Sequence, residues 1–168
     1  MIVYPIGISG QKLVFTKRVV AHLEAHRQLR LWNREAGGQL FACICDGDII
    51  VQEATGPRPT DQRSRWSYLP DRPAEQQEID ALHASGYFYV GSWHTHPQRR
   101  PTPSSVDLAS LAESVRLSEH SLNGFLLAVM GQEPAPDGLY VAVGDGTGVY
   151  RLEPDCRRSS LIFGKRTA

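Results

Sequence analysis

The chain reads YFYVGSWHTHP at residues 87–97. The first half of this stretch is aromatic and β-branched, which is typical of a strand. Side chains two positions apart on a strand share a face, so His94 and His96 can point to one spot. Pro97 then ends the strand, because it has no N–H to donate to a neighbouring strand. The stretch therefore predicts a strand that presents two imidazoles together at its end.

A carboxylate follows these histidines after a short basic loop. The chain reads PSSVD at residues 103–107, where Ser104 or Ser105 is a favourable helix N-cap and Asp107 falls in the first helical turn, facing back toward the histidines. Two imidazoles and one carboxylate are the three protein ligands of a catalytic zinc that keeps a fourth position open. A lone His-x-His pair is most often structural, but both halves at this spacing predict a metal site.

An acidic residue with two glycines behind it lies upstream. The chain reads EAGGQLF at residues 35–41, and apolar runs on either side of Asp46-Gly47-Asp48 predict a hairpin. Glu35 then stands where the first strand of that hairpin begins. The glycines permit close approach of another backbone or of a substrate. Alone, Glu35 would be interpreted as a solvated residue at a strand start; beside a metal site it is a candidate catalytic base.

Together these residues resemble a known family. Glu35, the His-x-His-Pro stretch and the Ser-x-x-Asp stretch match the signature, called JAMM, of the JAB/MPN metalloenzymes. The resemblance implies one zinc ion per chain, bound by His94, His96 and Asp107. It implies that Glu35 accepts a proton from the attacking water and passes it to the leaving amine, and that the Ser104 hydroxyl bonds to the developing oxyanion. The alternative role of Ser104 is to cap the helix, and one hydroxyl is not expected to do both.

The remaining chain indicates strands in runs, with helices between them, rather than strict alternation. We expect strands at residues 2–6, 12–15, 40–45, 49–51, 87–96, 125–130, 139–143 and 149–152, of which the continuous apolar run at 125–130 is typical of a strand buried on both sides. We expect helices after Thr16, from Ala74 to Ser85 with Asp71 or Arg72 leading into it, and from Ser105. The second helix has its apolar face at Ile79, Leu82 and His83, and the third has its buried stripe at Leu108, Leu111, Ala112 and Val115. The order of strands and helices predicts an α+β fold with α-β-α layers, in which helices flank a mixed β-sheet. The resemblance covers about residues 14–153 and implies the JAB/MPN fold, of cytidine-deaminase-like type, with the zinc at one sheet edge.

Length and composition limit the classes of protein. The 168 residues favour a single domain over residues 1–168, with a polar C-terminal tail at 154–168. Lys+Arg and Asp+Glu both number 18, so the net charge does not indicate a nucleic acid or a membrane as the partner. Three cysteines cannot form a disulfide framework, and no apolar run approaches the roughly 20 residues of a membrane span. We expect a cytoplasmic protein.

The segment of residues 56–73 is the longest irregular stretch, and long loops in compact domains are commonly functional. Its Trp66 and Tyr68 are suited to binding an extended peptide, as are Arg99 and Arg100 beside the metal loop. The alternative is that the aromatic residues only pack the loop against the domain.

Two other pairs of side chains have ligand-like spacing. His22 and His26 share a helical face, but the absence of a carboxylate at a useful spacing favours ordinary helix histidines. Cys43 and Cys45 share a strand face, but their apolar neighbours favour inert thiols over zinc ligands or a nucleophile.

The resemblance also implies a reaction, which is hydrolysis of a peptide or isopeptide bond after the C-terminal tail of a ubiquitin-like protein. The stretch at residues 35–41 is similar to that of small bacterial JAB proteins from anti-phage operons. In those operons the joined protein is a ubiquitin-like modifier or a cGAS-like nucleotidyltransferase, and the expected partner is its tail. The alternatives are a peptidase for sulfur-carrier ubiquitin-like proteins, a non-catalytic scaffold, and a DNA-repair-associated JAB protein. The complete ligand set argues against the scaffold, and the neutral net charge argues against DNA.

Overall fold

The computed structural model describes residues 1–117 and 122–155. The strands are β1 (Ile2–Pro5), β2 (Lys12–Phe15), β3 (Gly37–Cys45), β4 (Asp48–Ala54), β5 (Gln62–Arg63), β6 (Tyr68–Leu69), β7 (Phe88–Thr95), β8 (Phe125–Met130), β9 (Leu139–Gly144) and β10 (Val149–Leu152), and the helices are α1 (Lys17–Ala25), α2 (Arg72–Ala84) and α3 (Ser105–Leu117). The predicted strands and the three predicted helices are confirmed. Of the tail predicted at 154–168, residues 156–168 lie outside the described part.

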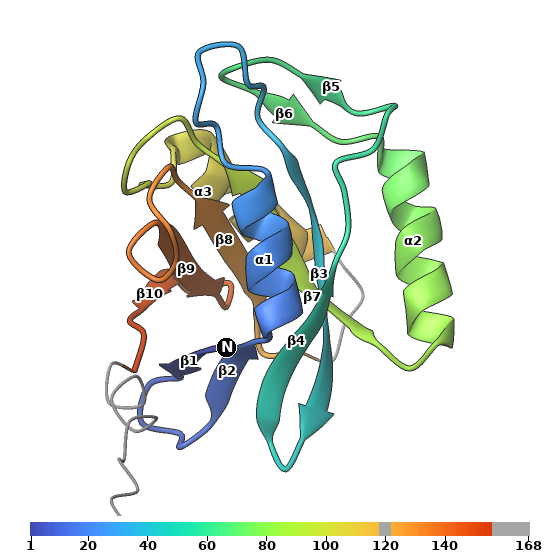
Figure 1. Cartoon of the computed structure of the whole chain (residues 1–168). Helices are drawn as coiled ribbons and strands as arrows, with labels where there is room; N and C mark the ends of the chain where they lie inside the picture. Colours follow the sequence, from blue (N-terminus) through green and yellow to red (C-terminus); the bar gives the residue numbers. More distant parts are fainter. Residues whose placement is uncertain (118–121, 156–168) are drawn as a thin grey trace, which may run out of the picture.

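One mixed sheet organises the described residues. Its strand order is β1-β2-β4-β3-β7-β8-β9-β10, and β5 pairs with β6 in a separate small hairpin (Figure 1). Strand β7 lies near the middle, antiparallel to β3 and parallel to β8. The segment that follows β7 therefore leaves from the end of a central strand. This places the predicted metal-binding residues at the end of the sheet rather than along a lateral edge strand.

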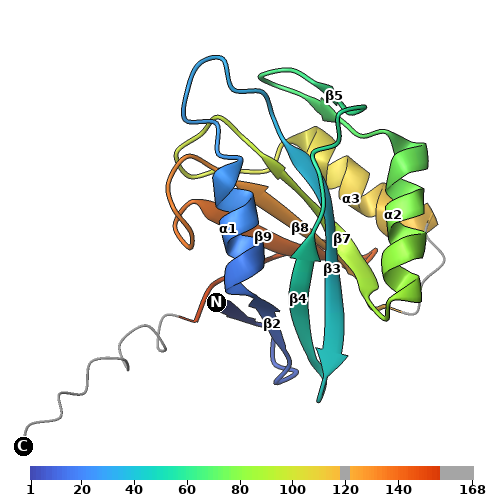
Figure 2. The same ribbon diagram turned by 45° about the vertical axis from the view of Figure 1, so that its right-hand side comes forward.

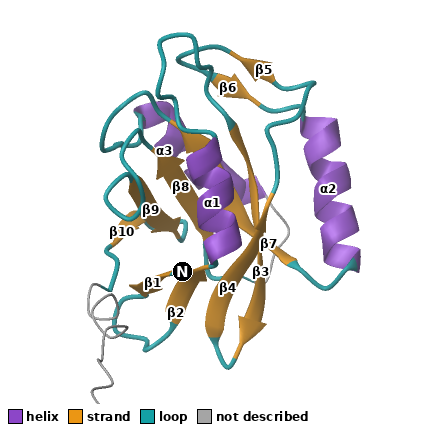
Figure 3. Ribbon diagram, in the orientation of Figure 1, coloured by secondary structure: helices purple, strands orange, loops and turns teal. Residues whose placement is uncertain are grey.

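The two faces of the sheet are covered by different helices. Figures 1 and 2 agree that α1 lies on one face and α3 behind the other, while Figure 3 shows α2 standing at the side. All six residues of β8 are buried, as predicted for a strand covered on both sides. Leu126, Ala128 and Met130 belong to the core cluster that contains the apolar residues of α1. Phe125, Leu127 and Val129 pack with Leu111 of α3. The layers are those predicted from the sequence.

Both glycines at the start of β3 allow close approach of other segments of this chain, and the described contacts are with Thr55 and Tyr68. A Cβ atom on Gly38 would lie 1.9 Å from the Thr55 carbonyl oxygen, and one on Gly37 would lie 2.6 Å from the Tyr68 ring. The strand end thus packs directly against β4 and against the β5–β6 hairpin. Glu35, two residues earlier, is brought beneath that hairpin.

Two predicted apolar faces were wrong in part. On α2 we expected Ile79, Leu82 and His83 to form the buried face, but His83 is exposed and the buried residue is Glu75. Glu75 turns inward because it faces the buried guanidinium of Arg58.

On α3 we expected Leu108, Leu111, Ala112 and Val115 to be buried, but Ala112 is exposed and Leu111 is the buried residue of the helix. The segment of residues 56–73 is also less irregular than expected, because it contains the β5–β6 hairpin. Within the described ranges, no helix has the length and apolar character needed to cross a membrane.

Candidate metal and hydrolase site

The two histidines of β7 converge on one point. The Nε2 atoms of His94 and His96 lie 3.1 Å apart, although the two residues are separated by a residue that points to the other face. On its far side, the His96 ring places Nδ1 3.1 Å from the Thr102 carbonyl oxygen. If Nδ1 carries the proton and donates it there, the Nε2 lone pair is directed at the same point as that of His94.

Asp107 completes this group from the first turn of α3. Its Oδ1 atom lies 3.3 Å from His94 Nε2, and its Oδ2 atom lies 3.4 Å from His96 Nε2. The Ser104 hydroxyl accepts the Asp107 backbone N–H at 3.2 Å, and the Asp107 carboxylate accepts the Ser104 N–H at 2.6 Å. Ser104 is therefore the N-cap, and this reciprocal capping fixes the carboxylate at the helix start. Among the described residues, His94, His96 and Asp107 form the group of ligand type that can hold a metal ion.

Charges at the site agree with this arrangement. Burial alone would raise the pKa of the Asp107 carboxyl, but bonds to His94 and to Ser104 hold that pKa well below its usual range. The pKa of His96 is lowered, first by burial and then by the neighbouring His94. An ionised carboxylate and a neutral imidazole are the protonation states in which these groups bind metals.

Glu35 faces the same cavity from the segment that precedes β3. The residue is only 6% exposed. It lines a cavity of about 620 Å³ together with His94, His96, Ser104 and Asp107. Burial, with a contribution from the Asp107 charge, raises the pKa of Glu35 to about 7, against an opposing effect of His94. A carboxyl with a pKa close to neutrality can both accept and release a proton at physiological pH.

The predicted substrate contacts divide into two groups. Trp66 and Tyr68 line the cavity, and Trp66 is 72% exposed at its mouth. Arg99 and Arg100 are not among the lining residues; both form ion pairs with Glu133 at 2.8 Å, outside the cavity. The cavity wall is therefore aromatic and apolar on the hairpin side, where Leu69 also contributes.

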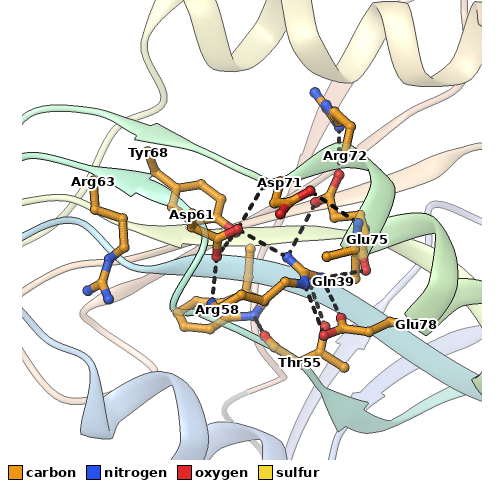
Figure 4. Close-up of polar contacts among 12 residues, drawn as sticks. Gln39, Thr55, Arg58, Asp61, Arg63, Tyr68, Asp71, Arg72, Glu75 and Glu78 are labelled. Carbon is orange, nitrogen blue, oxygen red and sulfur yellow. Dashed lines mark hydrogen bonds and ion pairs between the residues drawn. The ribbon is translucent and has the colours of Figure 1, made fainter.

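A buried arginine anchors the hairpin. Arg58, which is 7% exposed, donates from Nε to Glu78 at 2.9 Å and from Nη2 to Gln39 of β3 at 3.1 Å (Figure 4). The Asp61 carboxylate accepts the Arg58 backbone N–H at 2.6 Å and the Tyr68 phenol at 3.1 Å. This connects β3, the hairpin and α2. Tyr68 thus packs the loop against the domain, which is one of the two alternatives expected for this segment, whereas Trp66 stays exposed.

The other two pairs lie apart from the site. His22 Nε2 is 3.0 Å from the Gly56 carbonyl oxygen, and both His22 and His26 pack against the Trp93 ring. Cys43 is half-buried and Cys45 is exposed, next to the turn at the far end of β3, and neither belongs to the candidate metal group.

Three further residues hold the segment that carries Glu35. Thr95 and Arg63 bond to its backbone, and Gln28 bonds to the Thr95 hydroxyl. For Thr95 the alternation along the strand already indicates a side chain that faces away from the metal, in a packing or supporting role. Gln28 and Arg63 had no such signal, because their partners are separated from them by long stretches of sequence.

Comparison with known proteins agrees with this geometry. Residues 16–149 match the model of a family described as prokaryotic homologs of the JAB domain. A protein named CD-NTase/cGAS isopeptidase from Escherichia coli (strain TW11681) is 28% identical over 110 residues, which are 64% of this chain and 70% of the relative. One of the same name from Pseudomonas aeruginosa (strain BWHPSA011 / Pa011) is 33% identical over 100 residues, 56% of this chain and 62% of the relative. A probable metalloprotease from Sinorhizobium fredii (strain NBRC 101917 / NGR234) is 30% identical over 113 residues, 64% of this chain and 69% of the relative.

Solved structures show the same fold at lower identity. A protein from Desulfitobacterium hafniense superposes with a TM-score of 0.58 at 21% identity, covering 83% of this chain and 88% of the other. At that identity the similarity concerns the fold alone.

Proposed function

The chain belongs to the family of prokaryotic JAB-domain homologs, and from that premise we propose that it is a zinc-dependent isopeptidase. Its relatives carry the names isopeptidase and probable metalloprotease, which support a hydrolase. The observation that carries the proposal is the convergence of a buried acid, Glu35, with His94, His96 and Asp107 on one cavity. We further propose that residues 1–168 form a single catalytic domain.

Zinc fits the three candidate ligands. Zinc takes nitrogen and oxygen ligands at about 2.0–2.2 Å in a tetrahedron, which sets neighbouring ligand atoms about 3.3–3.5 Å apart. His94 Nε2 lies 3.1 Å from His96 Nε2 and 3.3 Å from Asp107 Oδ1, and His96 Nε2 lies 3.4 Å from the other carboxylate oxygen, Oδ2; one ligand atom from each residue can be chosen so that all three lie within 4.8 Å of one another. Three protein ligands leave the fourth position for water or substrate. When bound, a zinc ion would lower the pKa of its water and polarise the scissile carbonyl.

The side chains around that position have separate roles in the proposed reaction. Glu35 accepts a proton from the attacking water and delivers it to the amine that leaves, and its pKa of about 7 suits both transfers. The Ser104 oxygen uses a lone pair to cap α3, and its own proton can still be donated to the developing oxyanion. Capping and oxyanion binding are thus compatible, contrary to our expectation that one hydroxyl would not do both.

We propose that the substrate is an extended C-terminal tail joined to a target protein. Two features support this: the aromatic cavity wall at Trp66 and Tyr68, and the names of the relatives, which point to a cGAS-like nucleotidyltransferase as the joined protein. A ubiquitin-like modifier is the other candidate, and with either one the sequence resemblance supports a role in anti-phage defence. Arg99 and Arg100 would contact the joined domain outside the cavity.

A fusion assay tests this proposal. The last residues of a nucleotidyltransferase or ubiquitin-like protein encoded by a neighbouring gene would be joined to a reporter through a peptide bond. The cleavage products would be identified by mass spectrometry. We expect a single cut after the final residue of the tail in zinc-loaded protein and no cut after chelation. Cutting that persists with a chelator would rule out the metal mechanism. A Trp66→Ser variant is expected to raise KM more than it lowers kcat.

A further inference from the structure

Four polar backbone atoms around Glu35 are all held by residues outside its own segment. The Glu35 N–H donates to the Ser64 carbonyl at 2.7 Å, and the Glu35 carbonyl accepts from Arg63 Nε at 2.5 Å. The Ala36 N–H donates to the Thr95 hydroxyl at 3.0 Å, and the Ala36 carbonyl accepts the Thr95 N–H at 2.8 Å. The backbone of both residues is thereby fixed from two sides, by the β5–β6 hairpin and by β7.

Thr95 connects this segment to the metal ligands. It lies between His94 and His96 on β7, and its side chain points to the opposite face, where it is fully buried. In a regular antiparallel pair the backbones would exchange both hydrogen bonds. Here the Ala36 N–H bonds to the Thr95 hydroxyl, at the point where the chain leaves the sheet ladder and Glu35 enters the cavity.

A buried amide supports the hydroxyl. Gln28 is fully buried, and its Oε1 accepts the Thr95 hydroxyl proton at 3.1 Å. Its Nε2 donates to the Arg65 carbonyl of the hairpin at 2.9 Å and to the Asn33 carbonyl at 3.3 Å. The Thr95 hydroxyl thus has its single proton and an acceptor position both engaged, which fixes its direction. A buried polar network of this kind is costly unless it is fully bonded.

We propose that Thr95, oriented by Gln28 and assisted by Arg63, is a positioning residue that sets the location of Glu35 relative to the metal ligands. The inference rests on the proposed function, because only a proton-transferring Glu35 requires such placement. Thr95 is suited to the role because it lies directly between His94 and His96, and its hydroxyl bonds to the Glu35 segment. The distance between base and metal is then set by one rigid element rather than by a flexible side chain.

The test compares three variants. Thr95→Val keeps the shape and removes the hydroxyl, Thr95→Ser keeps the hydroxyl, and Thr55→Val removes another half-buried hydroxyl, which accepts the Gln39 N–H at 3.3 Å. In the tail-fusion assay, Thr95→Val is expected to lower kcat roughly tenfold or more with KM and zinc content unchanged. Thr95→Ser and Thr55→Val are expected to stay within about twofold of the wild type, since loss of stability alone does not change kcat per folded molecule.

A second readout does not depend on activity. Amide hydrogen exchange of Ala36 should become faster in Thr95→Val than in wild type or Thr55→Val, and should recover in Thr95→Ser. Unchanged Ala36 exchange in Thr95→Val, or an unchanged kcat at equal zinc content, would overturn the proposal. Absence of cleavage by the zinc-loaded wild type would instead refute the proposed function, and Ala36 exchange would still decide whether Thr95 holds this segment.

Discussion

The protonation of Glu35 is governed by its burial. A carboxyl that is 6% exposed is ionised only at a cost, and its pKa is raised from 4.5 to about 7. The folded state therefore binds the proton more tightly than the unfolded chain does. The corresponding stability is fully present below pH 4.5, and it is lost as the pH rises through 7.

Glu35→Gln should consequently stabilise the metal-free protein at pH 8, since a neutral amide removes the buried charge. The expected gain is roughly 3 kcal/mol at pH 8 and close to zero at pH 4.5, since a shift from 4.5 to about 7 corresponds to about 1.4 kcal/mol per pKa unit. Urea unfolding of chelator-treated protein at both pH values measures it. Glu113→Gln, on the exposed surface of α3, is the matched control. A gain that is equal at both pH values would contradict the shifted pKa.

Single residues also show where sequence patterns stop being informative. The ligands could be identified because their spacing along the chain reflects one strand end and one helix start, and Glu35 because it precedes two glycines and matches the family signature. Gln28 and Arg58 could not, because each is buried by partners 20 or more positions away, such as Arg65 for Gln28 and Glu78 for Arg58. A local sequence pattern cannot predict contacts with residues so distant in the chain.

At the level of elements, Ser104 caps the start of α3, and the proposed function adds a catalytic role for the same hydroxyl. A glycine at the N-cap costs only a few tenths of a kcal/mol relative to serine, whereas alanine costs about 1 kcal/mol. Ser104→Gly should therefore keep the stability nearly unchanged while kcat falls by roughly 10²–10³, the loss typical of a missing oxyanion donor. Thermal unfolding and the fusion assay separate the two roles, with Ser105→Ala as control. Full activity in Ser104→Gly would leave Ser104 as a helix cap only.

The β5–β6 hairpin is anchored by Arg58, and the contribution of this anchor to the free energy of unfolding can be measured. Removing one partner from a buried ionic cluster leaves uncompensated charges, which costs about 3–5 kcal/mol. Arg58→Met should lower the free energy of unfolding by that order, because Asp61, Glu75 and Glu78 lose their counter-charge.

Arg18→Met provides the comparison. Arg18 pairs with Glu53 at 2.5 Å, but its side chain is 75% exposed, and surface pairs contribute about 0–1 kcal/mol. Equal small losses in both variants would show that the Arg58 cluster does not hold the fold together.

The elements themselves were predictable where local chemistry decides them. The Thr16 and Asp71 caps, the turn at Asp46-Gly47 and the apolar strand β8 follow from propensities of neighbouring residues. The β5–β6 hairpin was missed because each of its strands has only two residues. It is held by side chains rather than by a long ladder. The inward face of α2 was misjudged because a charged residue, Glu75, is buried there.

For the molecule as a whole, the proposed metal would join β7 and α3, two elements that the apolar core already holds together. The apolar core on both faces does not depend on the ion. Zinc at 100 times its dissociation constant should therefore add about 2.7 kcal/mol of stability, and chelation should lower Tm by several degrees without loss of helix and strand signal in circular dichroism. His94→Ala should abolish the zinc-dependent shift. Complete unfolding on chelation would mean that the folded state depends on the metal rather than on the apolar core.

The central claim is that Glu35 performs proton transfer at a metal site built by His94, His96 and Asp107. Its most direct test is cleavage of the tail fusion by Glu35→Ala at measured zinc content. We expect one zinc per chain in the variant, as in the wild type, and no detectable cleavage. Cleavage at the wild-type rate with the zinc in place would contradict the claim.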